Sequence, residues 1–239
     1  MSGHSKWSTI KHKKAKEDAK RGKVFTKLIR EITVAAREGG GDLAGNARLR
    51  DIIEKAKAAN MPQDNVTRAI KKGTGELAGV NYEAATYEGY GPHGIAIIVE
   101  TLSDNKKRTV SDLRHLFSKM GGTLGESGSV AWMFEHKGVI KIFADGLNED
   151  AILEKMLDYN IEDVIINDGI ATIICNIQEL DVVKKGAQEV GFKVEYSSIE
   201  WVPKNFVSLN SKEQEEKVYK FLEVIEDLDD VQNVYANIS

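Results

Sequence analysis

The sequence predicts an α+β protein with three domains: a basic helical domain and two ferredoxin-like α/β plates, the second inserted into the first. Three observations lead to this prediction. Apolar residues recur at helical spacing as far as about residue 75, and strand-like runs follow from there onward. Residues 137–203 read as βαββαβ, the order of a ferredoxin-like sandwich. The segments on either side of them supply the parts of one further plate.

The domain boundaries follow from counting these parts. Residues 80–136 offer ββαβ, and residues 204–239 offer a helix and a strand. Neither segment is complete alone, whereas together they make one plate of two layers. We therefore expect a basic three-helix domain with a flexible N-terminal arm over 1–79, a discontinuous α/β domain over 80–136 plus 204–239, and an inserted domain over 137–203.

Three helices are expected before residue 75. The first covers about 15–38 and stops at three consecutive glycines, which can adopt the left-handed conformation that ends a helix. Asn46 caps a second helix that reaches about residue 59. A third, short helix begins near residue 64 and ends at residue 72, before a glycine.

Beyond residue 75 the period of the apolar residues changes to that of strands. Strands are expected at 86–90, 95–102, 129–135, 139–143, 161–166, 170–176, 194–199 and 231–238. Helices are expected from Thr109, with Asp112 completing a capping box, and at 149–159, 180–190 and 212–226. Glycine turns at 91–94 and 167–169 join neighbouring strands.

The charge is distributed very unevenly. Residues 2–75 hold 18 Lys and Arg against 8 Asp and Glu, a net charge of +10, within a chain whose formal charge is -4. The remainder therefore carries -14. Such an asymmetry indicates that the basic part binds a polyanion, while the acidic part repels that polyanion elsewhere on the molecule.

The basic side of the first helix is the leading candidate for this contact. On a helical wheel its apolar residues face one way and its cations face the other. The cations expected to meet phosphate are Lys20, Lys23, Lys27 and Arg30. The alternative is the solvated face of an ordinary surface helix, although such faces usually mix both signs of charge.

The arm and the other two helices add further candidates. Lysines surround Trp7 in residues 2–14, which suits a segment that becomes ordered on nucleic acid, with the indole stacking on a base. The alternative is that Trp7 docks on the helical domain. These segments contribute Lys6, Trp7, Lys11, Lys13, Lys14, Arg48, Arg50, Lys71 and Lys72 to the predicted nucleic-acid-binding residues.

One loop in the acidic part is a candidate as well. The segment SDNKKR, residues 103–108, joins a strand end to a helix start and places Lys106, Lys107 and Arg108 beside exposed helical N–H groups, which favour phosphate. The alternative is a capped surface turn whose cations bind nothing.

The residues predict no catalytic constellation, metal site or cofactor. The single cysteine, Cys175, lies in an Ile-rich strand where a small buried residue is expected, and the histidines have no metal-binding spacing. A nuclease using His4 and His12 is the enzymatic alternative, weakened by their place on a flexible arm. The aliphatic runs are too short to span a bilayer, and a secretory signal is not evident, so we expect a cytoplasmic protein without a membrane partner.

Four long segments resemble the YebC family, also called the probable transcriptional regulatory proteins. They are SGHSKWSTIKHKKAKEDAKRGKVFTKLIREI, NARLRDIIEKAKAANMPQDNVTRAIKKGTG, EGYGPHGIAIIVETLSDNKKRTVSDLRHLFSKMGGTLGESGSVAWMF and LEVIEDLDDVQNVYANIS. The resemblance covers essentially the whole chain. Small departures, Lys107 and Thr123 where the family suggests Asn, do not touch the basic stretch.

The resemblance implies three domains and a cytoplasmic, non-enzymatic regulator of gene expression. Some members of the family are described as DNA-binding transcriptional regulators. Others, including the mitochondrial translational activator of cytochrome c oxidase subunit I, act with RNA and the ribosome. Both nucleic acids therefore remain candidates, and the oligomeric state is left open. The residues show no evident helix-turn-helix pair with base-reading side chains, which favours contacts to phosphate. A pure protein adaptor acting through the α/β plates is a further alternative.

Overall fold

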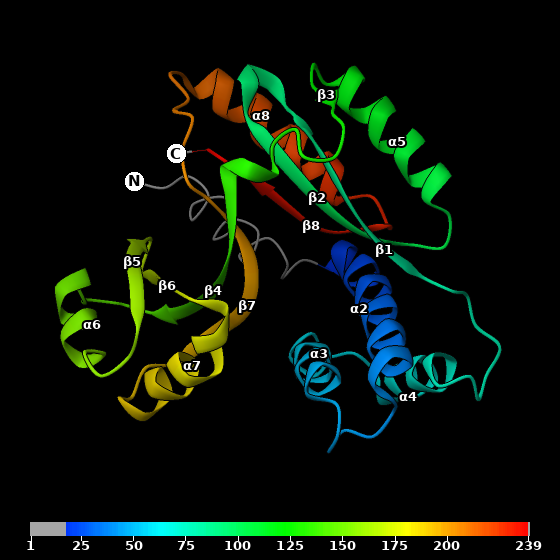
Figure 1. Cartoon of the computed structure of the whole chain (residues 1–239), viewed down its shortest axis with the longest axis horizontal. Helices are drawn as coiled ribbons and strands as arrows, with labels where there is room; N and C mark the ends of the chain where they lie inside the picture. The colour runs from blue at the N-terminus through cyan, green and yellow to red at the C-terminus, as the bar shows by residue number, and fades with distance from the viewer. Residues whose placement is uncertain (1–17, 239) are drawn as a thin grey trace.

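The computed structural model describes residues 18–238, with side chains from residue 21 onward, and combines a group of helices with two antiparallel sheets (Figure 1). The predicted α+β class is confirmed. One sheet has the strand order β3-β1-β2-β8 and the other has β5-β6-β4-β7. Each sheet carries two helices on one of its faces.

The N-terminal helices are α2 (Asp18–Gly39), α3 (Ala47–Ala58) and α4 (Gln63–Gly73), close to their predicted spans. Asn46 caps α3 as expected, because its side-chain oxygen accepts a hydrogen bond from the N–H of Leu49 at 3.0 Å. Its amide group also donates to the carbonyls of Ala35 and Gly40, so that this one side chain holds the end of α2 against the start of α3. Apolar residues of all three helices form a common core.

The first sheet is built from segments far apart in the sequence. Its elements are β1 (Glu83–Tyr90), β2 (Ala96–Ser103), β3 (Thr123–Leu124) and β8 (Val231–Ala236), with α5 (Lys106–Lys119), α8 (Lys212–Glu226) and the short turn η1 (Pro92–Gly94). The C-terminal strand β8 pairs with β2, with Val234 opposite Val99. Phe117 of α5 and Phe221 of α8 meet edge to face over the sheet, with ring centroids 5.0 Å apart.

The prediction of a strand at 129–135 was wrong. Residues Ala131–Met133 form a 3-10 turn, η2, and the strand that follows belongs to the other sheet. The buried carboxylate of Glu88 explains the difference, because it accepts hydrogen bonds from the N–H groups of Gly128, Val130 and Ala131 at 2.7–2.8 Å. These bonds use the backbone donors that a strand would need. The short β3, within the glycine-rich residues 121–128, takes the edge of the first sheet instead.

The second sheet has the strand order expected of a ferredoxin-like plate. It contains β4 (Phe134–Phe143), β5 (Ile161–Asn167), β6 (Ile170–Cys175) and β7 (Val194–Pro203), covered by α6 (Glu149–Lys155) and α7 (Leu180–Glu189), the latter preceded by η3 (Ile177–Glu179). Asp168 and Gly169, with φ of 49° and 76°, make the tight turn between β5 and β6.

The strands β4 and β7 lead into and out of the second sheet side by side. They pair along their whole length, and Phe134 at the start of β4 lies opposite Pro203 at the end of β7. Phe134 also packs with Val130 and Tyr235 on the face of the first sheet that α5 and α8 leave uncovered. The apolar residues thus gather into separate clusters for the helices and for each sheet. The division into three domains agrees with these clusters but stays a prediction.

A glycine in α7 provides a test of the packing in the second sheet. A Cβ atom on Gly186 would overlap the ring of Tyr159, so we expect Gly186→Ala to lower the free energy of unfolding by about 1–3 kcal/mol. Denaturant unfolding measures this change. The neighbouring exposed Lys185 serves as the control, and Lys185→Ala should stay within about 0.5 kcal/mol of the parent. Equal stability of the two variants would contradict this packing.

Candidate nucleic-acid interface

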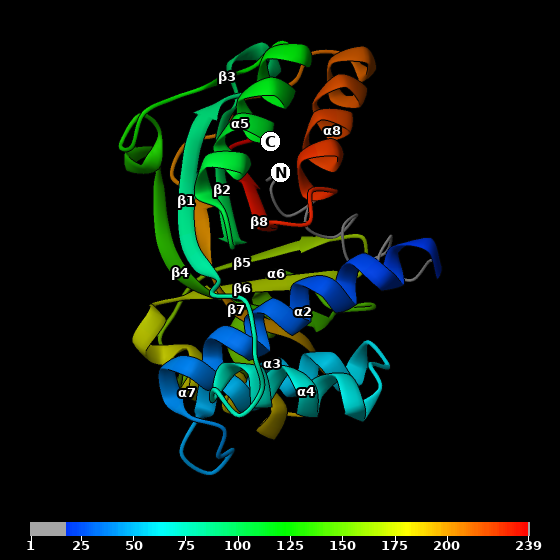
Figure 2. The same ribbon diagram turned by 90° about the vertical axis from the view of Figure 1, so that its right-hand side faces the viewer.

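The basic side of α2 faces another part of the protein. Lys23 pairs with Asp227 at 3.2 Å, and the ammonium group of Lys27 donates to the carbonyl of Glu226 at 2.9 Å. One turn further on, Arg30 bonds to Asp230. Figure 2 shows α2 passing between α3 and α4 on one side and the start of β8 on the other. The expectation that this side is open to solvent is therefore corrected.

The contact has a plain physical reason. Residues 226–230, which we call the acidic turn, link the C-terminal end of α8 to β8 and hold four acidic residues. The C-terminus of a helix also carries partial negative charge on its free carbonyls. A row of cations on α2 and an acidic helix end therefore attract each other within one molecule.

Asp230 lies at the centre of this junction and is only 8% exposed. Its carboxylate accepts hydrogen bonds from Arg30 at 2.6 Å, from Thr109 at 2.7 Å, from Ser103 at 3.0 Å and from Arg108 at 3.2 Å. Burial acts to raise the pKa of Asp230, but these four donors outweigh it and hold the pKa below its ordinary value. The group therefore stays charged at neutral pH.

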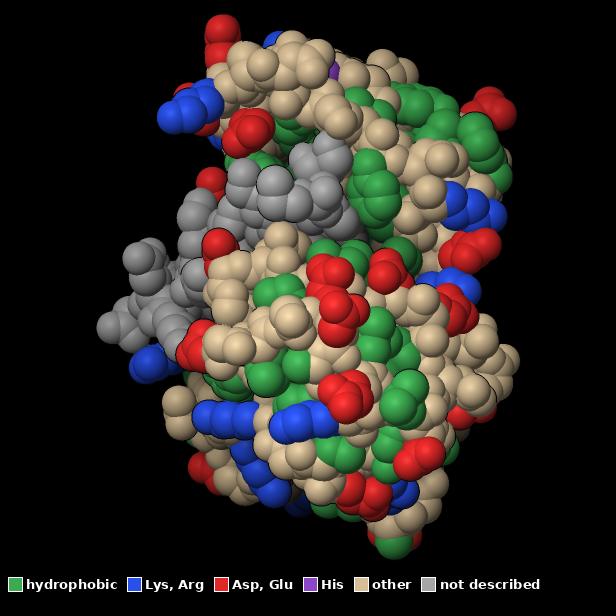
Figure 3. Space-filling model, turned by 90° about the vertical axis from the view of Figure 1, so that its left-hand side faces the viewer, with side chains coloured by type: hydrophobic (Ala, Val, Ile, Leu, Met, Phe, Trp, Pro, Cys, Tyr) green, Lys and Arg blue, Asp and Glu red, His purple; other side chains and the backbone are tan. Residues whose placement is uncertain are grey.

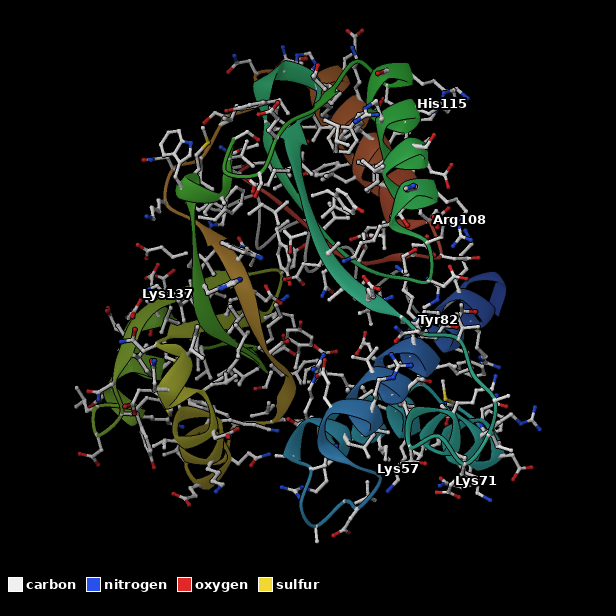
Figure 4. All side chains as sticks on the ribbon, turned by 45° about the vertical axis from the view of Figure 1, so that its right-hand side comes forward. Lys57, Lys71, Tyr82, Arg108, His115 and Lys137 are labelled. Atoms are coloured by element: carbon white, nitrogen blue, oxygen red, sulfur yellow. The ribbon has the colours of Figure 1, made fainter. Side chains whose placement is uncertain are left out.

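The second predicted cation group meets the same turn. Helix α5 begins at Lys106, earlier than expected, because Asn105 and not Thr109 caps it, accepting from the N–H of Arg108 at 3.1 Å. Lys106 pairs with Glu83 at 2.7 Å. Arg108 pairs with Asp104 and Asp230, and Figure 4 shows it at the start of α5, above Tyr82. Of these three cations, Lys107 alone forms no ion pair with a described residue.

A pocket of about 410 Å³ lies at this junction, next to Tyr82 and Thr109. Its charged lining consists of the guanidinium groups of Arg30 and Arg108 and of four carboxylates. These are Asp104, Asp112, Asp229 and Asp230. A net negative lining does not suit phosphate.

Some of the cations on α3 and α4 have partners within the protein, and others have no ion-pair partner among the described residues. Arg48 pairs with Glu38, and Arg50 donates to the carbonyls of Leu43 and Ala44. Lys55 lies over the ring of Tyr196, 5.8 Å from its centroid. The other four cations of the two helices form no ion pair with any described residue, and we call them the α3–α4 cations. They are Lys57, Arg68, Lys71 and Lys72. Figure 4 shows Lys57 and Lys71 well away from Arg108 and Tyr82.

Sequence reasoning included Lys71 and Lys72 but missed Lys57 and Arg68. Arg68 precedes Lys71 by three residues on one helix, a spacing that puts the two side chains on the same face. That spacing is the signal that could have identified Arg68.

The short connection between α3 and α4 lies where the sequence predicted it, but its likeness to a helix-turn-helix pair was not expected. Residues 59–62 alone separate the two helices, which is the turn length of a helix-turn-helix pair. Asn60 supports the sharp change of direction with a φ of 57°, a conformation that Asn tolerates better than most residues. At the start of α4, Gln63, Asp64, Thr67 and Arg68 are exposed.

Several predicted residues lie outside the described part of the chain. They are Lys6, Trp7, Lys11, Lys13 and Lys14, together with His4 and His12 of the nuclease alternative. Lys20 lies on α2, but its side chain is not among those described. Their roles stay predictions.

Other parts of the surface and interior offer little for a site. On the face that Figure 3 shows, acidic and basic side chains lie among hydrophobic ones, and neither sign covers the face continuously. Within residues 18–238 there is no group of three or more His, Cys, Asp or Glu residues that could hold a metal ion. Over the same range, no helix has the length and apolar character needed to cross a membrane. Burial raises the pKa of the Cys175 thiol to about 11, so it is not a reactive thiolate at neutral pH.

Replacement of Asp230 tests the importance of the junction. Asp230→Asn leaves the buried guanidinium of Arg30 without its charge partner, so we expect the free energy of unfolding to fall by about 3–5 kcal/mol in urea denaturation at pH 7. Asp229→Asn, which changes an exposed neighbour, should stay within about 0.5 kcal/mol of the parent.

The same variant has a defined pH dependence. The pKa of Asp230 is lower in the folded state than the value of about 3.9 in an unfolded chain. The ionised carboxylate therefore stabilises the fold fully above the unfolded pKa, and this stabilisation is lost as the pH falls through the folded pKa. The stability difference between parent and Asp230→Asn should therefore narrow at acid pH. A difference that stays constant from pH 7 to pH 3 would contradict this role.

Comparisons with known proteins agree over the whole length of the chain. The family model of the TACO1/YebC protein N-terminal domain matches residues 5–76, and the family model of the TACO1/YebC second and third domain matches residues 82–238. A probable transcriptional regulatory protein of Desulforapulum autotrophicum is 52% identical over 99% of this chain and 96% of its own length. Another, from Chlorobaculum tepidum, is also 52% identical, over 100% and 95%. The crystal structure of a conserved hypothetical protein from Aquifex aeolicus superposes with a TM-score of 0.85 at 47% identity, covering 94% of this chain and 93% of that one. The chain belongs to the TACO1/YebC family.

Proposed function

We propose that this protein is a regulator of gene expression that binds nucleic acid through the α3–α4 cations. The observation that carries the proposal is the presence of four such side chains on two adjacent helices, without an acidic partner among the described residues. Cations that are not neutralised internally can release counterions from a polyanion, which is the main source of affinity for nucleic acid. The basic sequence of residues 2–14 adds to the same charge.

DNA is the first candidate for the bound nucleic acid. The relatives carry the name of transcriptional regulatory proteins, and α3 and α4 have the order and turn length of a helix-turn-helix pair. In such pairs the first residues of the second helix contact base edges. Gln63, Thr67 and Arg68 hold those positions on α4, and Gln and Arg are side chains that form paired hydrogen bonds with adenine and guanine.

RNA, including ribosomal RNA, is the second candidate. The lysine-rich sequence around Trp7 favours it, because lysines interleaved with one aromatic suit contacts to a phosphate backbone and stacking on an unpaired base. Binding of a ribosomal RNA fragment in preference to duplex DNA of equal length would select this alternative.

The electrostatic part of the proposal is tested with a quadruple variant. Replacing Lys57, Arg68, Lys71 and Lys72 by Gln should flatten the plot of log affinity against log salt. The slope should fall by about 0.9 per residue on duplex DNA, or about 0.7 on a single strand. Fluorescence anisotropy of a labelled oligonucleotide between 50 and about 200 mM salt measures it.

The matched control removes four cations from α7 and α8, away from the helices α2, α3 and α4. They are Lys184, Lys185, Lys217 and Lys220. This variant has the same net charge as the test variant and should keep nearly the whole slope. Equal losses in both variants would reject the α3–α4 surface as the contact site.

Base contact is tested separately. Gln63→Ala and Arg68→Ala should each reduce discrimination between a preferred duplex and its single-base variants by about 1–3 kcal/mol, whereas Lys71→Ala should weaken all sequences equally. Binding to a randomised duplex library, followed by sequencing, gives the preferences of each variant. If the parent has no sequence preference, or if Gln63→Ala keeps it, α4 does not read bases.

A further inference from the structure

We infer that the acidic turn competes with nucleic acid for the basic side of α2, so that the protein restrains its own binding. This inference concerns the regulation of the proposed function and rests on it. In the arrangement described above, Lys23, Lys27 and Arg30 are held by residues of the same chain. Nucleic acid reaches the cations at the exposed end of this row only by displacing the turn.

The acidic turn presents oxygen atoms to α2 much as a phosphate backbone would. The three cations lie at spacings of four and three residues, which puts them in one row along α2. Each meets an oxygen that bears full or partial negative charge: a carboxylate, then a backbone carbonyl at the helix end, then a second carboxylate. A phosphate backbone lying along α2 would present negative oxygens to the same row.

The ion pairs at the two ends of the row differ in burial, and the more exposed pair can open and close reversibly. At its outer end, the side chains of Lys23 and Asp227 are 44% and 51% exposed, and ion pairs so open to water hold weakly and are screened by salt. At its inner end, the side chains of Arg30 and Asp230 are about nine-tenths buried and tied to α5. We therefore assign the outer end, around Lys23, as the part that exchanges the turn for phosphate, while Arg30 keeps its partner.

The test compares single substitutions on α8 and the turn after it. Asp227→Asn removes the exposed partner of Lys23. Glu216→Gln makes the same change of net charge at an exposed position of the same helix, eleven residues and therefore about 16 Å earlier along the axis. That separation exceeds the distance of about 8–10 Å over which charges act at moderate salt. Each is combined with Lys23→Gln, and binding of a labelled oligonucleotide is followed across a salt series.

We expect Asp227→Asn to bind several-fold more tightly than the parent at low salt. Its salt slope should be steeper by about 0.9 on duplex DNA, or by about 0.7 on a single strand, because one more cation reaches phosphate. The gain should disappear when Lys23 is also Gln, and Glu216→Gln should change the slope little. Unchanged melting temperatures establish that the variants are folded.

Two outcomes overturn the inference while leaving the proposed function intact. In one, the parent binds and Asp227→Asn behaves as Glu216→Gln does. In the other, the gain from Asp227→Asn is the same with and without Lys23, which makes it a general effect of charge. If the parent binds neither duplex nor single-stranded oligonucleotides at 50 mM salt, the proposed function itself fails, and the inference fails with it.

Discussion

The buried carboxylate of Asp230 is the constraint on which the arrangement of the helices and the first sheet depends. A charge removed from water must be matched by donors that are held in place, and here the donors come from separate elements: Arg30 from α2, Ser103 from the end of β2, and Thr109 and Arg108 from α5. None of these elements can shift without leaving a charge or a hydroxyl group unsatisfied. The Nε atom of Arg30 already lacks a hydrogen-bond partner among the described groups, so the loss of one more donor or acceptor would leave a further buried polar group unsatisfied.

The junction also changes the meaning of the uneven charge distribution. From the sequence, the acidic remainder was expected to keep a polyanion away from most of the molecule. In the structure, one acidic segment lies directly on the basic helix. A tethered group acts at a high effective concentration, in the millimolar range for short linkers, so even weak carboxylate contacts can rival an external ligand. Charge separation along a chain therefore predicts attraction within the molecule as well as binding outside it.

Much of the fold could be predicted because local signals and tertiary packing agree. The helix at 212–226 was predicted with its observed bounds, and Asn46 was identified as a cap from its residue type and its place before an apolar stripe. The errors arose where a distant side chain decides the local structure. The backbone N–H groups around Val130 bond to Glu88, forty residues earlier, and no periodicity within that segment records this.

The site was less predictable than the fold for a related reason. A helical wheel shows which residues share a side of α2, but it does not show what that side contacts, so Arg30 was expected in solvent and is buried. For Arg108 the sequence indicated an exposed helix start, and the structure adds the carboxylate that occupies it. The α3–α4 cations became candidates only when the ion pairs of their neighbours were known, because availability is a property of the whole surface.

The pairing of Phe134 with Pro203 has a consequence for how such a chain could arise. Paired residues of adjacent strands lie about 5 Å apart, so the second sheet leaves and rejoins the rest of the chain almost at one point. The ends of a surface hairpin lie equally close, which means that the whole sheet occupies the place of a loop. An ancestral gene could have gained these residues in one insertion event without moving α8 or β8, and a lineage could lose them in the same way.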